Sequence, residues 1–338
     1  MAAKLGISRF EPDTGEPLAP GHGALAFLAA RKPEEYGNPR CFRKMVKNLR
    51  KAGYKILCSV DAGTPAQFGC VDEPDFLDRY DIDFLHLDNG YSENRLQSLA
   101  RTLPVVLSTS SFQAEDKELL LALNPDLLFI HNCYPKEDTG LDLDTFKRFC
   151  GNVPLDHLAV FIPGDERLLG PLHEGLVTLE DDRGKPPYTA FVRFQEMGIR
   201  HILVADPGLS RFQRSLIEQA RQGIYPVPCH LDKTDLYGRV FTIRRDSPAG
   251  LWRLQESCGL DEAAAGIEPF QSGWPRYRGD ICQDNEEFGC FSGEITVIGR
   301  NLPAKSRINT VGRIDPDYLP LLDFIGNGRR IILVKECE

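Results

Sequence analysis

The 338-residue chain is longer than one hydrophobic core usually supports, so its length favours two domains. Its content of 42% hydrophobic and 26% charged residues is typical of a folded globular protein and excludes a disordered or repetitive chain. The net charge of −9, without a Lys-rich or Arg-rich run, argues against a surface for nucleic acid or anionic lipid.

The sequence also bears on the compartment. It has no run of 18 consecutive apolar residues, and its first residues do not form the apolar stretch of a signal peptide. The ten cysteines are dispersed, without a CxxC pair or zinc-finger spacing. We therefore expect a cytoplasmic protein with reduced cysteines, several of which are simply small core residues.

From residue 4 to about residue 223, short β-rich apolar runs alternate with helical stretches. The predicted strands span residues 4–10, 24–28, 54–60, 84–87, 105–107, 127–130, 158–162 and 202–204. The predicted helices span residues 40–52, 75–80, 114–123, 144–150, 188–197 and 209–221. Strands joined mostly by helices indicate a parallel sheet, and eight of them favour a closed TIM (β/α)₈-type barrel over an open doubly wound sheet.

One connection of this barrel is irregular. Residues 11–23 contain three prolines and three glycines instead of an apolar helical stripe. We therefore expect the first crossover helix to be missing or replaced by a loop. A thinner wall at this place leaves two alternatives: it exposes a patch through which the chain forms a homo-oligomer, or the second domain shields it.

The pattern changes after about Gly223. Short strand-like runs follow, separated by turn-rich segments, at residues 240–244, 281–282, 295–298 and 331–334. They predict a small antiparallel β-rich domain over residues 224–338, after a barrel domain over residues 1–223. Residues 221–228 are the predicted linker, because one glycine and two prolines end the preceding helix and favour an extended chain.

Barrel enzymes place their chemistry where the strands end and the following loops begin. The polar candidates at those positions are Asp61, Asp88, Ser110, His131, Asn132 and Asp206. Residues 164–187, after the seventh strand, form a long loop that adds Glu174 and Glu180. A loop of this length in a tight barrel is more often functional than idle.

Each candidate also has a structural alternative. Asp61 or Asp88 at a strand end can simply cap the next helix. His131 can be a satisfied histidine of the barrel wall, and Glu180 can belong to a solvated turn. His86 is better explained as structural, because it shares a strand face with Asp88 and only the residue at the strand end need reach a substrate.

Carboxylates gathered with hydroxyl, amide and imidazole groups suit a glycosidase. One carboxyl group protonates the leaving oxygen, and a second acts as nucleophile or base. Glu174 and Asp88 are the best candidate pair. Metal binding is the competing use of such residues, but the sequence has no HxH or HExxH signature, so we expect neither a metal nor a cofactor.

Several motifs carry a family resemblance. They begin at Leu5 (LGIS), His86 (HLDNG), His131 (HNCYPKEDTGL), Gly170 (GPLHEGLVTLE), Arg278 (RGDICQDNEEFG) and Arg307 (RINTVGRI). In this order the sequence resembles bacterial 6-phospho-N-acetylmuramidases, which pair a barrel with a C-terminal cyclophilin-like domain. The strings at His131 and Gly170 are long enough that a chance match is improbable.

The resemblance implies hydrolysis of the β-1,4 bond between 6-phospho-N-acetylmuramic acid and N-acetylglucosamine during cytoplasmic recycling of cell-wall fragments. The positions that match the family's motifs are Asp88, His131, Asn132, Tyr134, Glu174, Glu180, Arg276 and Arg278. Our hypothesis is that Glu174 is the acid/base and Asp88 its partner. The resemblance leaves two roles open for Arg276 and Arg278, which either bind the lactyl carboxylate or the 6-phosphate or belong to a structural turn.

Residues that depart from the family pattern, Arg9–Phe10 and Ala205–Gly208, indicate a divergent member whose substrate can be another phosphorylated or acidic disaccharide. Two other functions stay open. One is a sugar-phosphate lyase or isomerase with His131 as base, and the other is a sugar-binding barrel without catalysis. In all three cases the expected partner is a small sugar, not a nucleic acid or a membrane.

Overall fold

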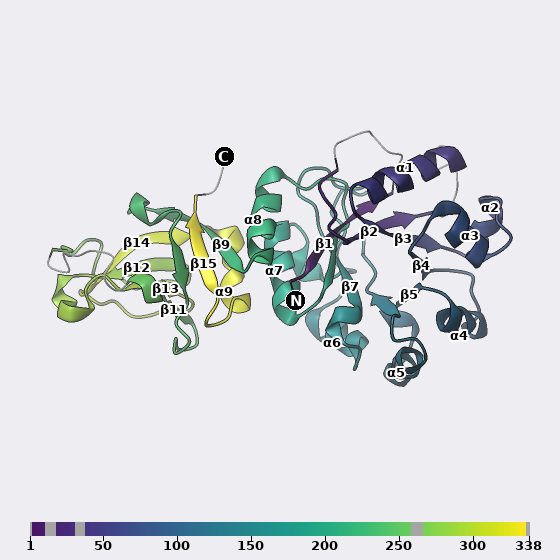
Figure 1. The fold of residues 1–338 in the computed structure, drawn as a ribbon. Coiled ribbons are helices and arrows are strands. Elements are labelled where there is room, and N and C mark those ends of the chain that lie inside the picture. Colours follow the sequence, from purple (N-terminus) through teal and green to yellow (C-terminus); the bar gives the residue numbers. More distant parts are fainter. Residues whose placement is uncertain (1, 11–17, 31–37, 258–265, 336–338) are drawn as a thin grey trace. The chain divides into compact units, whose positions relative to one another are not determined.

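The computed structural model describes residues 2–10, 18–30, 38–257 and 266–335. The chain divides into two compact units, Met1–Ser210 and Arg211–Glu338. Figure 1 shows a barrel surrounded by helices in the first and a β-rich domain in the second. Within the described residues, no helix has both the length and the apolar character needed to cross a membrane.

The first unit contains a closed barrel of eight strands, in which each strand pairs in parallel with its neighbour in sequence. The strands are β1 (Lys4–Arg9), β2 (Leu25–Ala29), β3 (Lys55–Val60), β4 (Phe84–Leu87), β5 (Val105–Ser108), β6 (Leu128–Ile130), β7 (Leu158–Ile162) and β8 (His201–Val204). Strand β8 closes the barrel by pairing with β1, with Lys4 opposite His201 and Ile7 opposite Val204. The predicted TIM-type barrel is therefore confirmed.

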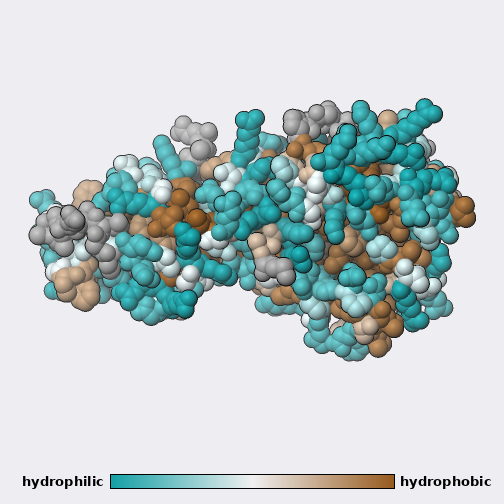
Figure 2. Space-filling model, in the orientation of Figure 1, coloured by the Kyte–Doolittle hydropathy of each residue, from teal (hydrophilic) through white to brown (hydrophobic). Residues whose placement is uncertain are grey.

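Helices surround these strands. They are α1 (Pro39–Lys51), α2 (Thr64–Gln67), α3 (Glu73–Tyr80), α4 (Glu93–Thr102), α5 (Ala114–Leu123), α6 (Leu143–Cys150) and α7 (Pro187–Met197). Helix α1 shows why the sequence predicts them. Asn38 caps its first turn by accepting the N–H groups of Arg40 and Cys41, and one stripe of the helix is buried. Its other face is hydrophilic, as Figure 2 shows.

The sequence prediction lacked α2 and α4. Helix α4 is capped by Ser92 but buries only Leu99 and Ala100, so its apolar stripe is too short to stand out in the sequence. Between β1 and β2, residues 18–24 contain no helix. Residues 11–17 lie outside the described residues, so the missing crossover helix and the self-association patch stay predictions.

Inward-facing side chains fill the barrel. Strand residues that pair in register point the same way, so Phe27 of β2 and Leu57 of β3 both face inward. The buried residues of this core are Leu25, Phe27, Leu57, Val106, Leu128, Ile130, Ala159, Phe161, Leu176, Leu203 and Ala205. The middle of the barrel is therefore packed, and cavities lie at its two ends.

The second unit contains helix α8 (Arg211–Arg221), the short helix α9 (Leu321–Phe324) and a seven-stranded sheet in the order β10-β15-β9-β14-β12-β13-β11. The strands are β9 (Ile224–Leu231), β10 (Val240–Thr242), β11 (Leu251–Arg253), β12 (Asp280–Asp284), β13 (Ile295–Ile298), β14 (Ile308–Ile314) and β15 (Arg330–Val334). The β-rich domain is confirmed, with one correction: β15 and β9 pair in parallel, so the sheet is mixed. Its cyclophilin-like character stays a prediction.

The predicted linker is wrong, because residues 224–231 form strand β9. Pro226 and Pro228 fit there because this half of β9 pairs with β15 on one side, whereas its pairing with β14 involves only residues 229–231. The carbonyl oxygen of Pro228 accepts Asp315 N–H, so the Pro228 carbonyl group points away from β15. Helix α8 belongs to the second unit, whereas we expected the boundary after it, at 223/224; the domain boundary itself stays a prediction.

Candidate active site

The carboxyl-terminal ends of the barrel strands enclose a cavity of about 230 Å³, which we call the mouth cavity. Its lining combines aromatic and apolar side chains with a few polar ones. These residues are Phe10, Phe27, Ala29, Ser59, His86, Asp88, Ile130, Asn132, Cys133, Tyr134 and Phe161. Such a lining is typical of a small-molecule site, in which apolar walls hold the ligand and polar groups orient it.

Asp88 is the carboxylate of this cavity. Its backbone N–H donates to Val60 O at 2.9 Å, which continues the pairing of β4 with β3 by one residue. The side chain is half-buried at the edge of the barrel, where the strand-end position predicted it. The structure therefore places a carboxylate against the aromatic wall of the mouth.

His86 also lines the mouth cavity, so the expectation that it is only structural is not supported. It lies two residues before Asp88 on the same strand face, and the residue is 5% exposed. The Nδ1 atom lies 2.9 Å from the hydroxyl of Ser59, which fixes the ring orientation. The alternation along β3 and β4 contained this signal, because both residues share the inward parity of Asp88.

Asn132 and Tyr134 follow β6 and line the same cavity. The Tyr134 backbone is held on both sides: its N–H donates to Val177 O at 2.9 Å, and its carbonyl accepts Arg183 Nη2 at 3.0 Å. Burial raises the pKa of the Tyr134 phenol, so the hydroxyl stays protonated near neutral pH. The structure thus brings together three predicted residues, Asp88, Asn132 and Tyr134.

An aromatic cluster forms the floor of the mouth cavity. The Phe27 and Phe161 rings meet edge to face with centroids 5.3 Å apart, and Phe10 lies 5.8 Å from Phe27. Such contacts hold the rings in a fixed arrangement. None of the three was among the predicted site residues, although Phe27 and Phe161 have the inward parity of their strands.

Asp206 holds the long loop after β7 instead of lining the cavity. The residue is 2% exposed. Oδ2 accepts the N–H groups of Gly164 at 2.9 Å and Leu176 at 3.1 Å, and Oδ1 accepts that of Leu169 at 3.0 Å. One side chain therefore ties the start of the loop to its middle, which makes Asp206 a positioning residue.

Glu180 has a similar role. It accepts the N–H groups of Asp138 at 3.0 Å and Gly140 at 2.7 Å and pairs with Arg183 Nε at 2.6 Å. The Arg183 hydrogen bond is the main reason why the pKa of Glu180 falls to about 2. Glu180 thus joins the loop after β6 to the loop after β7, and it remains ionised while doing so.

Glu174 lies in the same loop but is held less firmly. Its side chain is half-buried, and Oε2 accepts Glu137 N–H at 3.2 Å. The residues on either side, His173 and Gly175, have positive φ angles of 57° and 82°. Glu174 does not line the mouth cavity, but it contacts the loop that carries Tyr134.

Two other candidates make local contacts. Asp61 Oδ1 accepts Gly63 N–H and the Thr64 hydroxyl, each at 2.9 Å, which supports its structural alternative at the turn before α2. Ser110 is exposed, and its hydroxyl lies 3.1 Å from that of Ser108. Neither residue lines the mouth cavity.

His131 lies in the barrel wall and is 0% exposed. Its Nδ1 lies 3.0 Å from the Thr109 hydroxyl, its Nε2 lies 3.5 Å from Cys150 Sγ, and its ring centroid is 4.3 Å from that of Phe146 in α6. Burial, and then the charge of Lys117, lower its pKa to about 3. This place behind the wall counts against His131 as the base of a lyase or isomerase.

Arg276 and Arg278 belong to a turn of the second unit. Arg276 is 7% exposed and donates from Nε and Nη2 to Pro303 O at 3.2 and 3.1 Å. Arg278 donates to Gly299 O at 2.9 Å and pairs with Asp323 at 2.7 Å. These contacts support the structural alternative for both arginines.

Among the described residues, no group of three or more His, Cys, Asp and Glu side chains is arranged to hold a metal ion.

Known proteins resemble this chain in sequence and in fold. Its sequence matches the family model described as 6-phospho-N-acetylmuramidase, N-terminal, over residues 26–219 and the corresponding C-terminal model over residues 230–334. No curated protein matches.

Two solved structures share the fold. A conserved Enterococcus faecalis protein of unknown function has a TM-score of 0.82 and 24% identity, over 99% of this chain and 97% of that one. An uncharacterized B. cereus protein has a TM-score of 0.76 and 21% identity, over 99% of this chain and 100% of that one. At these identities the two structures establish the fold alone.

Proposed function

Because the chain belongs to the 6-phospho-N-acetylmuramidase family, we propose that it hydrolyses the β-1,4 bond of 6-phospho-N-acetylmuramyl-N-acetylglucosamine at the mouth of its barrel. The family description supports a glycosidase acting on a phosphorylated muramic sugar. The exact disaccharide, and the place of the reaction in cytoplasmic cell-wall recycling, are part of the proposal. The observation that carries it is the carboxylate of Asp88 in an aromatic-lined mouth cavity.

The mouth cavity suits one sugar unit. Phe27 and Phe161 offer an apolar surface for the face of a pyranose ring, whereas Asn132 and the Tyr134 hydroxyl offer hydrogen bonds to its substituents. His86, held by Ser59, faces the same space. In this arrangement Asp88 acts on the anomeric centre, as nucleophile or as base for a water molecule.

Glu174 is the proposed acid/base. Glu180 and Asp206 each accept backbone N–H groups that fix the loops, so their carboxylates have structural partners. Glu174 accepts a single hydrogen bond, at 3.2 Å, among the described residues. It is thus the loop carboxylate best able to turn toward a glycosidic oxygen when substrate enters.

The test is cleavage of the phosphorylated disaccharide and of its unphosphorylated counterpart by the purified protein, followed by mass spectrometry of the released sugars. We expect cleavage of the phosphorylated compound and loss of activity in Glu174→Gln. Asp181→Asn is the matched control, because Asp181 is a 76% exposed carboxylate in the same loop. Binding without cleavage would favour a sugar-binding protein, and full activity of Glu174→Gln would remove Glu174 from the mechanism.

A further inference from the structure

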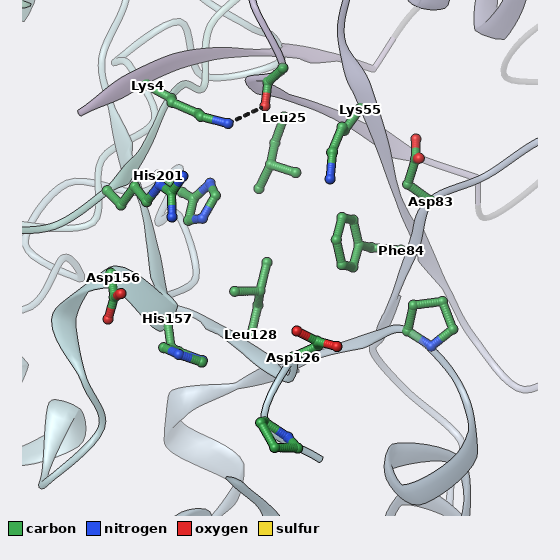
Figure 3. A pocket seen from close by; sticks show the side chains of 14 residues that line it. Lys4, Leu25, Lys55, Asp83, Phe84, Asp126, Leu128, Asp156, His157 and His201 are labelled. Atoms are coloured by element: carbon green, nitrogen blue, oxygen red, sulfur yellow. Dashed lines mark hydrogen bonds between the residues drawn. The ribbon is translucent and has the colours of Figure 1, made fainter. Parts of the chain in front are cut away.

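A second cavity, of about 580 Å³, opens at the amino-terminal ends of the barrel strands, and we call it the base cavity. Figure 3 shows its side chains, many of which come from the first positions of the strands. Leu25 and Leu128 belong both to its lining and to the barrel core, so its floor is apolar. Charged groups surround this floor, at an end of the barrel that usually serves stability alone.

Three cations line the base cavity. Lys4 begins β1, Lys55 begins β3 and Arg200 precedes β8. Lys4 donates from Nζ to Gly23 O at 2.9 Å, and Lys55 Nζ lies 5.8 Å from the centre of the Phe84 ring. Within the described part of the chain, Lys55 and Arg200 form no ion pair.

In the part of the chain that the structure describes, the carboxylates of the cavity form no ion pair with Lys55 or Arg200. Asp83 is engaged elsewhere, because its Oδ2 lies 3.2 Å from Arg50 Nη2 and accepts Ile56 N–H at 2.7 Å. Asp126 and Asp156 are exposed. Figure 3 shows Lys4, Lys55 and Asp83 in its upper half and Asp126 and Asp156 in its lower half, so the two lysines and the two exposed carboxylates lie on different sides of the cavity, which we call its basic and acidic sides.

His201 lies among the cations and is half-buried. Its Nδ1 and the Nε of Arg200 are buried nitrogens without a hydrogen-bond partner in the described part of the chain. Burial, followed by the charges of Arg200, Lys4 and Lys55, lowers the pKa of His201 to about 4. Both nitrogen atoms are buried, so neither is presented to a ligand in the cavity; His201 and Arg200 contribute to the wall a neutral imidazole ring beside a positive charge.

We infer that the base cavity binds a small phosphate monoester. The phosphate oxygens accept hydrogen bonds from the basic side, formed by Lys4, Lys55 and Arg200, and His201 lies beside these cations in the same wall. Hydroxyl or amino groups of the same ligand donate to Asp126 and Asp156 across the cavity. The volume of about 580 Å³ is that of an ordinary small-molecule site. This site is separate from the mouth cavity and does not depend on the proposed hydrolysis.

Binding can be measured with the full chain, using inorganic phosphate and glucosamine 6-phosphate as probes and glucosamine as the unphosphorylated control. Calorimetry gives the affinity, and NMR of ¹³C-histidine-labelled protein follows the His201 ring. We expect both phosphates to bind saturably and to raise the pKa of His201, because an anion offsets the three nearby positive charges. Glucosamine should leave the His201 resonances unchanged.

Variants locate the site. Lys55→Gln and Arg200→Gln should each weaken phosphate binding, followed through the His201 resonances, by about tenfold in Kd. Asp88→Asn at the mouth, and Lys51→Gln on the exposed end of α1, should leave it unchanged. Lys55→Gln should also keep any glycosidase activity, so failure of the proposed hydrolysis would not affect this test.

Two results would overturn the inference. One is the absence of any saturable change at His201 with millimolar glucosamine 6-phosphate, which the wild-type chain alone can show. The other is binding that survives Lys55→Gln and Arg200→Gln but disappears in Asp88→Asn, because the ligand would then occupy the mouth cavity.

Discussion

The mouth and the base of the barrel are built by the same strands but have opposite character. At the mouth, Glu180 ties the loop after β6 to the loop after β7, Asp206 holds the loop after β7 in place, and the cavity beside them is small and aromatic. At the base, Lys4, Lys55 and His201 begin their strands and line a larger cavity with charge. The comparison shows that the strands determine which side chains point into the barrel, whereas the residues that connect the strands determine what each end of the barrel can bind.

The largest effect should come from the mouth carboxylate. Asp88→Asn should lower kcat/KM for the phosphorylated disaccharide by about 100-fold to 10,000-fold, because the amide cannot serve as base or nucleophile. Steady-state kinetics measure this, with Asp181→Asn as a control of equal chemistry. A loss below tenfold would contradict a catalytic role for Asp88, and catalysis would then no longer distinguish the mouth of the barrel from its base.

Asp206→Ala tests whether one carboxylate holds the mouth loop. It leaves three backbone N–H groups without their acceptor, so the free energy of unfolding should fall by about 3 kcal/mol. Urea denaturation measures the loss, and limited proteolysis should find new cleavage between residues 164 and 187. Asp165→Ala is the control, because Asp165 accepts one exposed N–H, from Ser210. An unchanged proteolysis pattern would show that other contacts fix the loop.

The base should respond to acid. The folded pKa of His201, about 4, lies below its ordinary value of 6.5, so between these values the unfolded state binds a proton that the folded state does not. Stability is therefore lost as the pH falls through this window, by about 2 kcal/mol at pH 5.

His201→Gln should remove this part of the acid sensitivity, measured as the difference in unfolding free energy between pH 7.5 and pH 5. The pKa of His131 is also lowered, to about 3, so His131 keeps its own contribution to the acid sensitivity in the His201→Gln variant. Equal acid sensitivity in wild type and His201→Gln would show that burial and the neighbouring cations do not lower the pKa of His201.

The smallest effect belongs to the second unit. Arg278→Ala removes hydrogen bonds to Gly299 O and Leu319 O and should lower stability by about 1 kcal/mol. The ratio of kcat/KM for the phosphorylated over the unphosphorylated disaccharide should not change. A selective loss for the phosphorylated compound would instead assign Arg278 to phosphate recognition.

Local patterns were enough to predict most elements. The limits of β4, β7, α5 and β13 agree with their predicted ranges, because apolar alternation, helix caps and turn residues are contained in a few consecutive positions. The strand-end rule predicts Asp88 and Asn132 as neighbours, whereas Tyr134 is predicted only by the family resemblance. The alternation along β4 could also have identified His86, whose parity equals that of Asp88.

Roles that depend on distant partners could not be predicted. Asp206 and Glu180 each accept a hydrogen bond from a backbone N–H group 42 positions away in the sequence. Because the sequence does not show these distant donors, the positions of the two residues in the loops suggest ligand binding instead. Strand β9 contains two prolines, so its sequence predicts a linker; its pairing with β15 on one side is what accommodates them in a strand.

The sequence by itself determined where strands and helices alternate, which strand residues face inward and which polar side chains follow each strand. Only the tertiary structure decided which of those polar groups remain available for a ligand. Closure of β8 on β1 brings Lys4 beside His201, residues far apart in the chain, and loop packing gives Glu180 and Asp206 their backbone partners. A short-range pattern fixes the direction of a side chain, whereas its partners depend on backbone groups that folding brings from elsewhere.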